Sequence, residues 1–153
     1  MFDLASYLPY LVNRVGVRLA EAFGAELAAH GLTLPMWRVL AALESKSGQR
    51  VGALAAMTSI ELSTLSRLLD AMARRALVRR RRAREDGRAV LVEPTAEGAA
   101  VTALLVPRAA QYEQAALAGF PAAEAEALKA MLVRVHRNLA ALEPDVGGER
   151  RIG

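Results

Sequence analysis

The sequence predicts a mainly α-helical fold with one small β-hairpin. Hydrophobic residues make up 54% of the 153-residue chain, aromatic residues only 5%, and cysteine is absent. Leucine and alanine recur at helical spacing over most of the length. The pattern changes within residues 78–93, where two short runs flank a charged segment that contains glycine. A chain of this length can build one compact domain with a real core, with or without helical extensions.

The first predicted helix covers residues 7–29, because apolar side chains recur there every three or four positions. Ser6 is expected to cap its start and Gly31 to end it. A second helix is predicted over residues 34–45, with Thr33 as its cap.

A short third helix is expected at about 51–57, followed by a tight connection at 58–60. The fourth helix runs from about 61 to 76 and has two faces. One face is an apolar stripe for the core, which consists of Leu65, Leu68, Leu69 and Met72.

Residues 78–83 and 89–93 are the predicted strands of the hairpin. Asp86-Gly87 lies between them, and Asp-Gly is a strong hairpin signal because both central residues of a type I′ turn need positive φ. Pro94 is expected to end the second strand, and Thr95 to cap the next helix.

Two further helices complete the prediction, at 96–118 and at about 122–142. Pro107 interrupts the first of them and should kink it unless neighbouring residues compensate. The last helix carries a seam for pairing with another helix, formed by Leu128, Leu132, Val135, Leu139 and Leu142. The tail from residue 144 to 153 has little to pack and is expected to be disordered.

The element order, with a charge maximum on the hairpin, predicts a winged helix-turn-helix. Eight arginines and two acidic residues lie within residues 74–88, so this stretch carries +6, whereas the whole chain carries +4. The basic character is therefore a local patch, as expected of a protein that grips a phosphate backbone.

The candidate DNA contacts combine the outer face of the fourth helix with the hairpin. Small hydroxyl residues followed by an arginine suit a helix that enters a major groove end-first, although they could also be ordinary solvated positions. Strand alternation sends Arg79 and Arg81 to the face opposite Arg80 and Arg82, so some of these arginines should meet acidic residues of the protein instead. The proposed contacts are Ser63, Thr64, Ser66, Arg67, Arg74, Arg80, Arg82, Arg84, Asp86 and Arg88.

Over residues 7–142 the chain resembles the MarR family of bacterial transcriptional regulators. The resemblance is carried by LTLPMWRVLAALES (32–45), STLSRLLDAMARRALV (63–78) and REDGRAVLVEPTAEG (84–98), with its Asp-x-Arg at the hairpin tip. Ala76 departs from the family's usual Gly after the recognition helix, which leaves open a helix that runs further.

The resemblance implies a homodimer in which each protomer presents one winged helix to a half-site of a pseudo-palindromic duplex. By the same resemblance, residues 1–31 and 96–143 would form the dimerisation helices, and residues 32–95 the DNA-binding lobe. Asp86 and Arg88 at the hairpin tip would probe the minor groove. Asp86 could instead serve only the turn.

Family resemblance also implies an effector, a small aromatic carboxylate or its coenzyme A thioester, whose binding releases DNA and makes the protein a repressor. Arg14 or Arg38 could pair with a carboxylate, while aromatic rings line an apolar cleft. Trp37 could instead anchor the core, and the arginines could be solvated or paired with Glu21 or Glu44. The candidate ligand-binding residues are Tyr10, Asn13, Arg14, Trp37, Arg38 and Tyr112.

Other classes of function find little support in the sequence. His30 and His136 have no catalytic partner at useful spacing, and no nucleophile motif or glycine-rich phosphate loop is present, so no enzyme, cofactor or metal site is expected. Without a signal peptide or an apolar run that could span a membrane, the cytoplasm is the expected location. The alternatives to an effector-responsive repressor are a constitutive or architectural DNA-binding protein and a module that binds an acidic protein.

Overall fold

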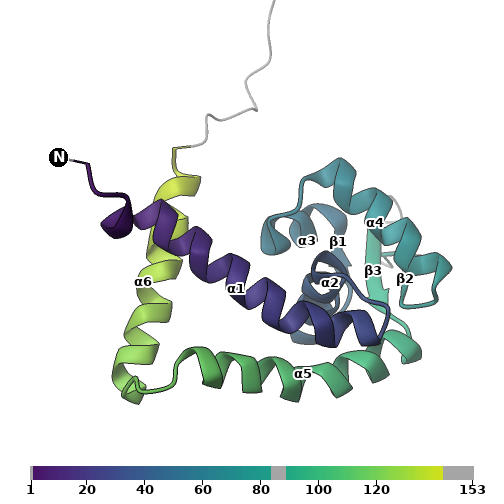
Figure 1. Ribbon diagram of the computed structural model, residues 1–153. Helices are drawn as coiled ribbons and strands as arrows, with labels where there is room; N and C mark the ends of the chain where they lie inside the picture. The colour runs from purple at the N-terminus through teal and green to yellow at the C-terminus, as the bar shows by residue number, and fades with distance from the viewer. Residues whose placement is uncertain (1, 84–88, 143–153) are drawn as a thin grey trace, which may run out of the picture. The chain divides into compact units, whose positions relative to one another are not determined.

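The computed structural model describes residues 2–83 and 89–142 (Figure 1). The chain forms two compact units, residues 1–116 and 117–153. Arg84, Asp86 and Arg88, the predicted turn and the tail from residue 144 lie outside the described residues. The elements are η1 (Leu4–Ser6), α1 (Leu8–Ala29), α2 (Leu34–Ser45), β1 (Gln49–Arg50), α3 (Val51–Thr58), α4 (Leu62–Arg74), β2 (Val78–Arg82), β3 (Val90–Pro94), α5 (Ala96–Ala116) and α6 (Ala122–Ala140).

The first unit contains a three-stranded antiparallel sheet in the order β1-β3-β2, so the predicted hairpin has a third strand. β1 was not predicted, because two residues are too few to show a strand period. Gln49 of β1 is buried and pairs with Val92, while its amide donates to the carbonyls of Ala42 and Lys46 at 2.7 and 2.9 Å. It thereby satisfies carbonyl groups at the end of α2.

The hydrophobic core lies among α2, α3, α4 and the sheet, with α5 packed alongside. Of α1, only the C-terminal part enters this core, through Phe23 and Leu27. The N-terminal part of the same helix exposes apolar side chains, namely Leu8, Leu11, Val12, Val15 and Leu19. The apolar stripe of α1 is therefore longer than the core it covers.

The expected signals at the ends of α1 and α2 are largely confirmed. Gly31 has φ +66° just after α1, and Thr33 caps α2 by accepting from the Met36 amide at 3.5 Å. The prediction for Ser6 is wrong. α1 starts after Tyr7 without a side-chain cap, because residues 4–6 form a separate 3₁₀ turn that Asp3 caps.

The end of α4 keeps the left-handed cap even though glycine is absent. Ala76 has φ +53°, and the Leu77 amide donates to the Met72 carbonyl at 3.0 Å. The helix therefore stops at Arg74 instead of running beyond residue 76. Thr95 caps α5 as predicted, since its hydroxyl accepts from the Gly98 amide at 3.0 Å.

α5 is a single helix that contains Pro107, so the proline does not split it. The second unit is represented by α6, which has no buried side chain. Its exposed apolar residues include Met131, Leu132, Val133 and Leu139. Two of these, Leu132 and Leu139, belong to the predicted seam.

Candidate nucleic-acid interface

α4 divides into the two faces that the sequence predicts. Leu65, Leu69 and Met72 are fully buried at 0% exposure, and they fix the rotation of the helix about its axis. The polar residues on the other side are all exposed, namely Ser63, Thr64, Ser66, Arg67 and Arg74. The outer face of α4 is thus a cationic, hydroxyl-rich surface on a helix anchored by its inner face.

Glu61 caps the N-terminus of α4, a role that was not predicted from the sequence. Its carboxylate accepts from the amides of Ser63 and Thr64 at 2.9 and 3.0 Å and from the Ser63 hydroxyl. The Ser63 hydroxyl, followed by the two amides, lowers the pKa of Glu61 to about 2. Glutamate is not among the usual cap residues, so the signal available was an acidic residue directly before the Leu-Ser-Thr start of the helix.

The arginines of β2 alternate between two faces, as predicted. Arg79 and Arg81 both reach Glu93 on the neighbouring strand, with nitrogen–oxygen distances of 3.1 and 2.5 Å. The hydrogen bond from Arg81 is the main cause that lowers the pKa of Glu93, and burial of the carboxyl opposes it. These two arginines therefore neutralise a buried acid of the sheet.

Arg80 points the other way and joins β2 to α4. Its guanidinium lies 2.5 Å from Asp70 and also donates to the Ser66 carbonyl at 3.2 Å. Arg82 is exposed, and its guanidinium has no hydrogen bond or ion pair with the part of the chain that the structure describes. The wing strand is consequently tied to the candidate recognition helix through Arg80.

Three of the predicted ligand residues come together in the first unit. Asn13, Arg14 and Tyr112 line an open groove of about 800 Å³ between α1 and the end of α5. Arg14 lies over the ring of Tyr10 at 5.4 Å, and Glu21 also lines the groove. Tyr10 itself does not line the groove, so the groove combines apolar walls with a cation that a ring outside the lining holds.

Trp37 and Arg38 do not line this groove. They border a separate depression of about 480 Å³ between α2 and the end of α3. Trp37 packs edge-on against Phe23 with ring centroids 5.4 Å apart, and Phe23 packs in the same manner against Tyr112. This stacking supports the alternative in which Trp37 serves the core.

Within residues 2–83 and 89–142, no helix is long and apolar enough to cross a membrane. No cluster of three or more histidine, cysteine or acidic side chains in those ranges could hold a metal ion.

The comparisons with known proteins agree on one family. A model of the MarR family matches residues 30–89, and no curated protein matches the chain. A MarR-family transcriptional regulator from Silicibacter pomeroyi is 33% identical, with a TM-score of 0.81 over 93% of this chain and 96% of that one. Two further solved structures are each 26% identical with a TM-score of 0.74.

One of these two is Bordetella bronchiseptica BpsR, described with the regulation of its DNA binding by 6-hydroxynicotinic acid, which covers 84% of this chain and 98% of its own. The other is the transcriptional repressor CouR bound to a 23-mer DNA duplex, which covers 89% of this chain and 96% of its own. By fold, order of elements and identity to the Silicibacter protein, this chain is a member of the MarR family of transcriptional regulators.

Proposed function

We propose that the chain is a homodimeric repressor that binds a pseudo-palindromic duplex and releases it when a small aromatic acid binds. The observation that carries this proposal is the outer face of α4, which Arg80 holds beside the wing strand. A helix and a strand that are fixed to each other can contact adjacent parts of one half-site. The MarR family consists of DNA-binding regulators, so no catalytic role is proposed.

Dimerisation would use the apolar side chains that the core leaves uncovered. The N-terminal half of α1 and the C-terminal half of α6 expose leucine, valine and methionine side chains. Patches of this kind on a regulator suit an interface with a second copy. Residues 1–31 and 96–143 would supply that interface, and residues 32–95 would form the DNA-binding lobe.

The contacts within a half-site would divide by chemistry. Ser63, Thr64, Ser66 and Arg67 would face base edges, where Arg67 can read guanine through O6 and N7. The second set, Arg74, Arg82, Arg84, Asp86 and Arg88, would serve phosphates and the minor groove. Arg80 would contribute chiefly by fixing the wing to α4, because its guanidinium already forms an ion pair with Asp70.

The effector would bind in the groove between α1 and α5. Arg14 would pair with the carboxylate, and Tyr112 would contact the ring. Tyr10 does not line the groove and would contribute by holding the Arg14 guanidinium over its ring. Arg14 and Arg38 were the two candidates to pair with the carboxylate. Arg14 lines the groove and Arg38 does not, which favours Arg14. The regulation of BpsR by 6-hydroxynicotinic acid, an aromatic carboxylic acid, supports the free acid as the effector. A coenzyme A thioester of such an acid is the alternative, but it has no free carboxylate, so Arg14 would have to meet another group of that ligand.

Duplex selection from a randomised pool, followed by affinity measurements at physiological salt, tests the DNA-binding proposal. We expect the selected inverted repeat to bind at least about 10³-fold more tightly than its scrambled version. Arg67→Gln should relax base preference at one position of each half-site. A preference below about tenfold would instead favour the architectural alternative.

A panel of free aromatic carboxylic acids, beginning with 6-hydroxynicotinic acid, and their coenzyme A thioesters tests the effector. An active compound should raise the Tm and lower the affinity for the selected duplex. Arg14→Gln should bind that duplex normally but no longer respond, whereas the matched variant Arg38→Gln should respond like the wild type. Constitutive DNA binding across the whole panel would refute the effector proposal and leave the DNA-binding proposal standing.

A further inference from the structure

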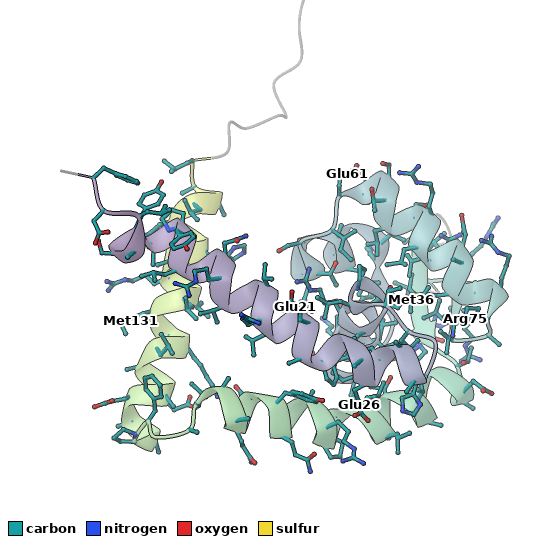
Figure 2. The ribbon with its side chains drawn as sticks, in the orientation of Figure 1. Glu21, Glu26, Met36, Glu61, Arg75 and Met131 are labelled. Carbon is teal, nitrogen blue, oxygen red and sulfur yellow. The ribbon has the colours of Figure 1, made fainter. Side chains whose placement is uncertain are left out.

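The C-terminal end of α4 is joined to the connection between α1 and α2 by one side chain. Arg75 follows the last residue of α4, and its Nη1 donates to the Gly31 carbonyl at 2.6 Å. The same nitrogen lies 3.4 Å from the sulfur of Met36 in the first turn of α2, and Figure 2 labels both residues. This contact links residues 44 positions apart in the sequence.

Gly31 is suited to this contact in two ways. Its φ of +66° is left-handed, which glycine adopts without strain. A Cβ at this position would lie 3.1 Å from Nη2 of Arg75, so the missing side chain also leaves room for the guanidinium. The Gly31 carbonyl lies two residues beyond the last residue of α1, where the helix dipole still favours a cation.

The other flank of the same junction is held by α5. The Thr95 amide donates to the Leu77 carbonyl at 3.1 Å, the Thr95 hydroxyl donates to the Ala76 carbonyl, and Gly98 packs directly on Leu77. The end of α4 is therefore bound to α5 on one side and, through Arg75, to α1 on the other.

We propose that Arg75 is a positioning residue that sets the angle of α4 against α1, although it belongs to the arginine-rich stretch. Its guanidinium is engaged with the protein, so it adds little to phosphate binding. This inference rests on the proposed function, in which α1 contributes to the dimer interface and α4 enters the groove. In a two-fold dimer, the angle between these helices determines the separation of the two recognition helices and hence the half-site spacing that binds best.

Arg75→Gln and Arg74→Gln form a matched pair for the test. Both remove one positive charge at neighbouring positions, but the Arg74 guanidinium has no hydrogen bond or ion pair within the described ranges. Each variant is titrated with the best inverted repeat selected by the wild type and with versions whose half-sites are moved by one base pair. The affinity for the best duplex is also measured over a series of salt concentrations.

We expect the wild type to lose at least about fivefold in affinity when the spacing changes, as is usual for coupling between sites. Arg75→Gln should shrink this loss below about twofold and keep the slope of log affinity against log salt. Arg74→Gln should keep the spacing preference and reduce that slope by about 1.8, because the substitution removes one phosphate contact, about 0.9, from each protomer of the dimer. Arg75→Lys retains a cationic donor for the Gly31 carbonyl and should keep both properties.

A reduced salt slope with unchanged spacing preference in Arg75→Gln would identify a phosphate contact and overturn the inference. Unchanged behaviour in both measurements would overturn it as well. If Arg75→Gln does not fold, Gly31→Ala takes its place, because the added Cβ would crowd the Arg75 guanidinium at 3.1 Å and leave the charge unchanged. A weaker spacing preference in Gly31→Ala supports the role, and an unchanged preference refutes it. A wild type that binds every spacing equally would refute the dimeric function itself, which is a separate result.

Discussion

Replacing Gly98 by alanine is expected to destabilise the fold, although alanine is the better helix former. Gly98 lies in the first turn of α5, where an added Cβ would stand 2.0 Å from the Leu77 carbonyl oxygen and 2.9 Å from its carbon. An ordinary carbon–oxygen contact needs roughly 3.3 Å, so the backbone must move by more than about 1 Å. The same oxygen accepts from the Thr95 amide, and the movement therefore also weakens that hydrogen bond.

The opposing effects can be compared in magnitude. Overpacking of a well-packed site costs about 3 kcal/mol at the upper end of its usual range. Loss of the Thr95 hydrogen bond adds about 1 kcal/mol. The higher helix propensity of alanine offsets about 1 kcal/mol of this destabilisation. Gly98→Ala should therefore lower the free energy of unfolding by about 3 kcal/mol, which corresponds to a fall in Tm of about 6–12 °C in a chain of this size.

Thermal unfolding followed by circular dichroism measures this shift. All samples need one protein concentration, because the Tm of the proposed dimer would depend on concentration. Gly52→Ala in α3 is the matched control, since a Cβ there meets nothing within 4 Å, and propensity alone should then leave its Tm unchanged or slightly raised. A Tm for Gly98→Ala equal to or above that of the wild type would show that the reasoning from the Leu77 contact is wrong.

Three further predictions concern the candidate interface and its supports. Ala76→Gly should raise the free energy of unfolding, measured by urea titration, by about 1 kcal/mol. The reason is that relief of the left-handed backbone strain exceeds the entropy that glycine adds to the unfolded chain. A loss of stability would contradict this prediction. The pKa of Glu61 is depressed to about 2, so its stabilising effect is present above the unfolded pKa near 4.5 and is lost as the pH falls toward 2. Glu61→Gln should therefore lower the urea midpoint more at pH 6 than at pH 3, and an equal difference at both values would refute the cap. Arg82→Gln should reduce the salt slope of DNA binding by about 1.8, because each protomer of the proposed dimer loses one phosphate contact of about 0.9. Arg81→Gln should leave that slope unchanged and cost less than about 1 kcal/mol of stability, because its ion pair is partly exposed. Equal slopes for the two variants would contradict this division.

The helices and the two longer strands could be predicted because their signals are local. Apolar periodicity located α1, α2, α4, α5 and α6, and the change of period located the wing strands. The Glu61 cap and the turn at residues 4–6 are local features that the sequence did not predict, whereas two other missed features depend on residues that are distant in the sequence. β1 exists because it pairs with β3, and Ala76 adopts a left-handed conformation while Thr95 and Gly98 hold the chain around it.

In the candidate interface, too, the features with a local signal could be predicted and the contacts between distant residues could not. The exposed face of α4 followed from its buried stripe, and the alternation of the β2 arginines followed from strand geometry. Their partners did not, because Glu93 and Asp70 become neighbours only when β3 and α4 pack on β2. The three ligand residues that meet in the groove were found as members of a larger set, and sequence alone could not separate Arg14 from Arg38.

The density of arginine in residues 74–88 therefore overstates the number of phosphates that the protein can neutralise. Six of the eight arginines there lie in the described part of the chain, and four of those six are engaged with protein groups, namely Arg75, Arg79, Arg80 and Arg81. If charge density alone governed binding, these six would add about 5 to the salt slope per protomer, whereas Arg74 and Arg82 by themselves add about 2. The engaged arginines instead hold α4, the wing and α1 in a fixed arrangement, so we expect their loss to change the sequence and spacing that the protein prefers more than its response to salt.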